Sequence, residues 1–155
     1  MRFFLFAAVV FATPALAQDI VPRDGTWSVR SVEAEMGAVC PPYFEPMAEQ
    51  MKANAGKRDL YDVSWRGAFN PNRARGLDPE QQGILWVEDG PRTWRANLAG
   101  DDKDYVVARM TLLSETEVRN TVNMDVEQMM AEEGGALPDV AGCTLTMTFL
   151  LEHKG

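Results

Sequence analysis

The chain has 155 residues, of which 46% are hydrophobic and 25% are charged, and its 15 Lys and Arg against 23 Asp and Glu give a net charge of −8. This composition is that of one globular domain, and it excludes a collagen-like chain, a disordered chain and a multi-domain assembly. The acidic balance also argues against nucleic acid as a partner, because a nucleic-acid binder shows clustered Lys and Arg.

Residues 1–17 are typical of a secretory signal peptide. A positive start precedes an unbroken apolar run over residues 3–12, and the segment ends on the small residues Ala15 and Ala17. The run is shorter than the roughly 20 apolar residues that a membrane span needs, and the two alanines fit the rule for cleavage. We therefore predict a mature domain of residues 18–155 with no membrane span, in the periplasm or secreted.

The first strand is predicted over residues 26–34. Trp27 and Val29 lie on one face of a period-2 pattern, which changes phase near Ser31 before Val32 continues it. A phase change inside an alternating run is typical of a β-bulge. We therefore expect a long strand with a bulge at this point.

The triplet Gly25-Thr26-Trp27 that opens this strand is similar to the GxW pattern of lipocalins and their calycin relatives. The resemblance implies an antiparallel β-barrel in which the Trp closes one end. The wider layout, a signal peptide followed by the GxW strand and a Cys, also resembles small exported Gram-negative proteins of unassigned function. Neither resemblance implies a catalytic residue.

Cys40 and Cys143 are the only cysteines in the chain. In an oxidising compartment, two thiols in a small domain form a bridge more often than a metal site, and the pair lacks the CxxC spacing of a redox centre. We therefore predict a disulfide that closes a loop of about 100 residues and ties the first strand to the last.

Helix is predicted in two places. One helix is expected over residues 46–55, because Pro46 suits a first helical turn and Gly56 suits the stop. Asp125 and Gln128 have the spacing of a capping box, which predicts a second, short helix.

Six further runs have the lengths and apolar patterns of strands, and Asp89-Gly90 predicts a tight hairpin turn between the second and third of them. These runs are 57–65, 83–88, 91–98, 104–113, 117–124 and 143–153. Closure of a sheet removes its exposed edges. We therefore expect a mainly β fold, an antiparallel meander of about seven or eight strands forming a small barrel with one or two short helices. A β-sandwich is the alternative.

Few groups in the chain could carry out catalysis. His153 is the single histidine, and its neighbour Glu152 would point to the opposite face of a strand, so that Glu152 could not orient the ring. The methionines fall on apolar positions typical of a core, and no carboxylate cluster matches a calcium loop. We therefore expect no catalytic residue, no metal site and no cofactor.

Four tryptophans, Trp27, Trp65, Trp86 and Trp94, all lie in predicted strands. Their rings would either line an apolar ligand pocket or fill the core. The first hypothesis is a non-catalytic exported barrel that binds an apolar or amphipathic small molecule, with the loop over residues 67–82 as a candidate lid. The alternative is a structural or interaction protein with a filled core that meets an envelope protein.

Overall fold

The structure, a computed structural model, describes residues 20–54, 59–77, 83–100, 102–132, 134 and 139–155. The predicted signal peptide at residues 1–17 and the last part of the 67–82 loop lie outside the described residues. Among the residues that are described, no helix is long and apolar enough to cross a membrane.

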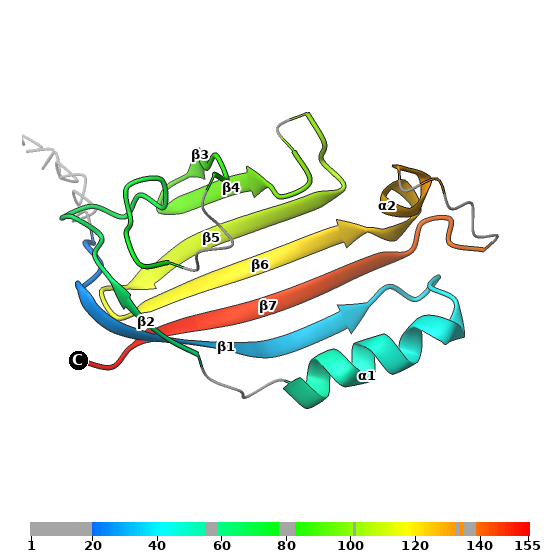
Figure 1. The fold of residues 1–155 in the computed structure, drawn as a ribbon, viewed down its shortest axis with the longest axis horizontal. Helices are drawn as coiled ribbons and strands as arrows, with labels where there is room; N and C mark the ends of the chain where they lie inside the picture. Colours follow the sequence, from blue (N-terminus) through cyan, green and yellow to red (C-terminus); the bar gives the residue numbers. More distant parts are fainter. Residues whose placement is uncertain (1–19, 55–58, 78–82, 101, 133, 135–138) are drawn as a thin grey trace, which may run out of the picture.

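Seven strands join one antiparallel sheet in the order β2-β1-β7-β6-β5-β4-β3 (Figure 1). In chain order the elements are β1 (Gly25–Met36), η1 (Pro42–Phe44), α1 (Glu45–Asn54), β2 (Asp59–Val63), β3 (Val87–Gly90), β4 (Thr93–Asn97), β5 (Val106–Ser114), β6 (Glu117–Asp125), α2 (Val126–Glu132) and β7 (Thr144–His153). The mainly β fold with two short α-helices is thus confirmed.

The sheet is not closed into the barrel that we placed first. The first and last strands, β1 and β7, pair as closure would require, but the sheet ends at β2 on one edge and β3 on the other. These edge strands have only five and four residues. The connection between them is described over residues 64–77 and 83–86, which together we call the segment 64–86, and these residues pack against the apolar face of the sheet. An open sheet is compatible with the sandwich alternative, although here an irregular segment takes the place of the second sheet.

The bulge in the first strand is confirmed, whereas the predicted hairpin turn is displaced. The register of β1 against β7 shifts between Ser31 and Glu33. The β3–β4 hairpin forms, but Gly90 pairs with Thr93, so that Pro91 and Arg92 make the turn in place of Asp89-Gly90. Proline has the φ that the first central position of a turn needs, and it has no N–H to donate to a neighbouring strand. Pro91 therefore favours a turn one or two residues later than Asp89-Gly90.

Gly25 allows the first strand to begin directly against the end of the last one. Its φ of +133° is rarely adopted by other residues, and a Cβ here would lie 2.8 Å from Nε2 of His153. The His153 ring and Trp65 pack edge to face on Trp27, at centroid distances of 5.5 and 5.7 Å. Trp27 of the triplet therefore lies in a small aromatic cluster where β1 begins and β7 ends.

Both helices lie toward the opposite end of the sheet, where β1 ends and β7 begins (Figure 1), and the disulfide lies at this end as well. Cys40 and Cys143 are bonded, as predicted. The backbone N–H of Gln128 donates to Oδ1 of Asp125 at 3.0 Å, which confirms the predicted cap of α2. Around the bridge, Val126 and Leu145 belong to a small buried cluster that we call the disulfide-end cluster, completed by Val140 and Cys143.

Candidate functional site

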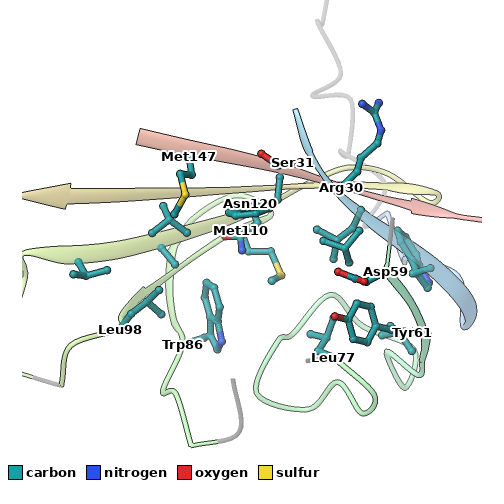
Figure 2. Close-up of a pocket in the computed structure, with 18 of the residues that line it drawn as sticks. Arg30, Ser31, Asp59, Tyr61, Leu77, Trp86, Leu98, Met110, Asn120 and Met147 are labelled. Atoms are coloured by element: carbon teal, nitrogen blue, oxygen red, sulfur yellow. The ribbon is translucent and has the colours of Figure 1, made fainter. Parts of the chain in front are cut away.

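A cavity of about 530 Å³ lies between the apolar face of the sheet and the segment 64–86 (Figure 2). Side chains of β1, β2, β5, β6 and β7 line it, and Leu77, Trp86 and Leu98 line it from outside the strands. The volume falls within the range of small-molecule pockets, about 300–1,000 Å³. The cavity is therefore the candidate functional site.

The apolar lining follows from strand alternation. On β5, Ala108 and Met110 face the cavity, and on the neighbouring β6 the cavity side carries Val122 and Met124. Ala108 also pairs with Ala96 of β4, so that two small side chains lie side by side in the middle of the sheet. Ala108 lines the cavity, and its small side chain leaves space that a larger one would fill.

Two of the four tryptophans predicted to bind a ligand line the cavity. Trp27 and Trp86, exposed by 0% and 5%, are among the lining residues. Trp65 instead packs between Trp27 and Phe69, and the indole N–H of Trp94 donates to the backbone carbonyl of Phe69 at 3.0 Å. Trp65 and Trp94 therefore hold the segment 64–86 onto the sheet.

Asn72 holds Trp86 at the cavity, a role that no sequence pattern predicts. Its Nδ2 donates to the Trp86 carbonyl at 2.7 Å, and its Oδ1 accepts from the Trp86 N–H at 2.8 Å. An Asn carboxamide offers a donor and an acceptor as a neighbouring strand would, so that Asn72 substitutes for a strand partner. In sequence, Asn72 lies within a turn-rich loop, and no local pattern distinguishes it from a turn residue.

The segment also folds back against the end of β2. Ser64, the first residue after β2, exchanges two backbone hydrogen bonds with Arg75, at 2.9 and 3.0 Å. The next residue, Gly76, lies so close to β2 that a Cβ would collide with the Asp62 carbonyl oxygen. The described part of the predicted lid is thus held by backbone hydrogen bonds to the residue that follows β2 and by the Trp94 side chain of β4.

Polar groups enter the cavity lining at a few points. Asp59 and Tyr61 lie on β2, and Asn120 lies on β6 (Figure 2). Arg30 is also among the lining residues, but its side chain extends away from the cavity in Figure 2, and its Nε lies 3.3 Å from the Glu152 carboxylate. The Asp59 carboxylate is therefore the charge directed toward the cavity from the described lining.

Two ion pairs, from Lys154 and Arg30, lower the pKa of the Glu152 carboxylate, which lies outside the cavity lining. Hydrogen bonds from Lys154 and Arg30 hold the pKa of Glu152 below its ordinary value of 4.5, against a smaller opposing effect of burial. Among the described residues, no three His, Cys, Asp or Glu side chains gather closely enough to hold a metal ion.

No protein-family model, curated protein or solved structure matches this chain. The lipocalin-like resemblance of the GxW triplet therefore stays an expectation from sequence.

Proposed function

We propose that this is an exported, non-catalytic binding protein that holds one apolar or amphipathic small molecule in the cavity beneath the sheet. The observation that carries the proposal is the cavity of about 530 Å³ with an apolar lining that includes Trp27 and Trp86. Ligand pockets are mostly apolar, with a small number of polar groups that orient the ligand. An open cavity of this size weighs against the alternative of an envelope interaction protein with a filled core.

Export to the periplasm or the exterior is part of the proposal. The Cys40–Cys143 disulfide supports it, because such bonds persist in oxidising compartments. The sequence of residues 1–17 supports it independently, through its apolar run and its small-residue ending. An export fusion that secretes a reporter only when these residues are intact would test this part.

Binding can be tested with an environment-sensitive dye such as N-phenyl-1-naphthylamine and a variant that fills the cavity. Ala108 is 1% exposed and lines the cavity, so that Ala108→Phe places a ring in the ligand's space. Leu113→Phe is the matched control, because Leu113 lies on the same strand, outside the cavity lining, and is 36% exposed. We expect the wild type and the control to bind the dye, and Ala108→Phe to bind it at least about tenfold more weakly.

Two results would count against the proposal. Equal dye affinity in Ala108→Phe and the wild type would place binding elsewhere on the protein. If the wild type changed neither the dye's emission nor that of its own tryptophans with any amphiphile tested, the cavity would have no binding function.

A further inference from the structure

Asn120 places a carboxamide in the middle of the apolar face. In the sheet it pairs with Met110 of β5 on one side and Phe149 of β7 on the other. Its cavity-side neighbours along β6 are Val118 and Val122, so that every adjacent position on this face is apolar. Asn120 is 6% exposed, and Figure 2 shows it at the sheet side of the cavity, above Trp86.

The Oδ1 atom of Asn120 is buried and accepts no hydrogen bond within the part of the chain that the structure describes. Leaving a buried acceptor unsatisfied destabilises a fold, and buried polar side chains normally have a partner. A leucine of similar size would pack here without that penalty. A molecule that enters the cavity could supply the hydrogen-bond donor that this acceptor lacks.

The charge near the cavity restricts what that partner can be. Figure 2 shows the Asp59 carboxylate directed toward the cavity beside Tyr61. The nearest cationic lining residue, Arg30, is turned away from the cavity and paired with Glu152. Within the described lining, one carboxylate and no facing cation favour a positive charge in the cavity over a negative one.

We infer that the ligand is an amphiphile whose apolar body fills the cavity and whose head group donates an O–H or N–H hydrogen bond to Oδ1 of Asn120. The head group is neutral or cationic, such as an alcohol or an amine, and it is not a carboxylate. This inference rests on the proposed binding function, and it adds the chemical class of the ligand. Asn120 offers an acceptor to such a head group, and the Asp59 carboxylate disfavours an anionic one.

The test compares three ligands of equal chain length, namely dodecylamine, dodecanol and dodecanoate, each displacing the bound dye at neutral pH below its aggregation threshold. We expect the amine and the alcohol to bind the wild type about tenfold or more tightly than dodecanoate, because hydrogen-bond and charge effects each amount to a severalfold change in affinity. Dodecanoate binding as tightly as the other two would overturn the inference.

Two variants separate the roles of the polar groups. In Asn120→Leu the affinity for dodecanol should fall about tenfold while the dye still binds, and the ligand-free protein should melt a few degrees higher. In Asp59→Asn the affinity for dodecanoate should rise severalfold, with that for dodecanol unchanged. An Asn120→Leu protein that keeps the wild-type order of affinities would contradict the role of the carboxamide.

Asp62→Asn is the matched control for charge. Asp62 lies on the same strand as Asp59 but is absent from the cavity lining, and its Oδ1 accepts a hydrogen bond from the Thr26 hydroxyl at 2.8 Å. Equal gains in dodecanoate affinity in both variants would indicate net charge rather than a local effect of Asp59, and would overturn that part. If no ligand and no dye bound the wild type, the proposed function itself would fail. Binding without the predicted order would refute the inference alone.

Discussion

The two ends of the molecule bury their apolar residues in different ways. At the disulfide end, Val126, Cys143 and Leu145 pack with the two helices around a covalent bond. Along the rest of the sheet, a cavity lies between strand residues such as Trp27 and the segment 64–86, which contributes Trp86 to its lining. The first region is held together by a disulfide, whereas the second contains a cavity.

The disulfide end of the sheet therefore contributes mainly to stability, and the rest of the sheet contains the proposed binding site. A bridge that joins residues 103 positions apart restricts the unfolded chain most, and it lies away from the cavity lining. The cavity side instead contains unfilled volume and the buried Oδ1 of Asn120, which accepts no hydrogen bond from the described residues. Both features lower stability. We therefore expect substitutions at the two ends to have separable effects on unfolding and on ligand binding.

The largest expected effect is that of removing the disulfide. The double variant Cys40→Ala and Cys143→Ala should lose about 2–5 kcal/mol of unfolding free energy, since the bridge closes a long loop. Its dye affinity should stay within about twofold of the wild type, because distant sites behave independently. Urea unfolding and dye titration of the same samples measure both quantities. Loss of dye binding in a folded double variant would show that the two ends are coupled.

A smaller loss of stability, joined to a loss of binding, is expected at Asn72. Asn72→Ala removes both hydrogen bonds to the Trp86 backbone and should cost about 1–3 kcal/mol of unfolding free energy. Because Trp86 lines the cavity, the affinity for the dye should fall as well. Arg73→Ala, an exposed change one residue further along, is the control and should alter neither quantity. Unchanged binding in Asn72→Ala would mean that Trp86 keeps its place without this support.

The smallest effect concerns Glu152, whose pKa is lowered by Lys154 and Arg30. A lowered folded pKa contributes stability that is present above the ordinary value of 4.5 and is lost as the pH falls through the folded value. Glu152→Gln should therefore reduce the unfolding free energy at neutral pH by at most about 0.5 kcal/mol, because these ion pairs are partly exposed. At a pH below the folded pKa, the variant and the wild type should unfold alike in urea. A difference that grew toward acid pH would contradict this sign.

The sequence predicted the features that depend on local patterns. Alternation located most of the strands, the phase change near Ser31 located the bulge, and the spacing of Asp125 and Gln128 located the cap of α2. The disulfide followed from there being only two cysteines. Each of these features depends on neighbouring residues or on composition, which a single sequence displays.

The features that the sequence did not predict depend on contacts between distant segments. Whether the sheet closes is decided by the segment 64–86 lying across its apolar face, which no alternating pattern encodes. Asn72 forms hydrogen bonds with Trp86, fourteen residues further along the chain. In the sequence, Asn120 is one polar position of an alternating strand, and only the pairing of β6 with β5 and β7 shows that its neighbours are apolar. Trp65 and Trp94 were expected at the ligand with the other two tryptophans, because sequence alone does not distinguish a lining ring from a packing one.

Native mass spectrometry of the mature protein, purified without denaturation from its own host, tests the central claim most directly. We expect a noncovalent adduct on the wild type that is retained by Leu113→Phe and absent from Ala108→Phe, and a denatured mass two hydrogens lower because of the Cys40–Cys143 bond. A wild-type protein of bare polypeptide mass that also takes up none of the added amphiphiles would contradict it. An adduct that persisted undiminished in Ala108→Phe would contradict the placement of the ligand in the cavity.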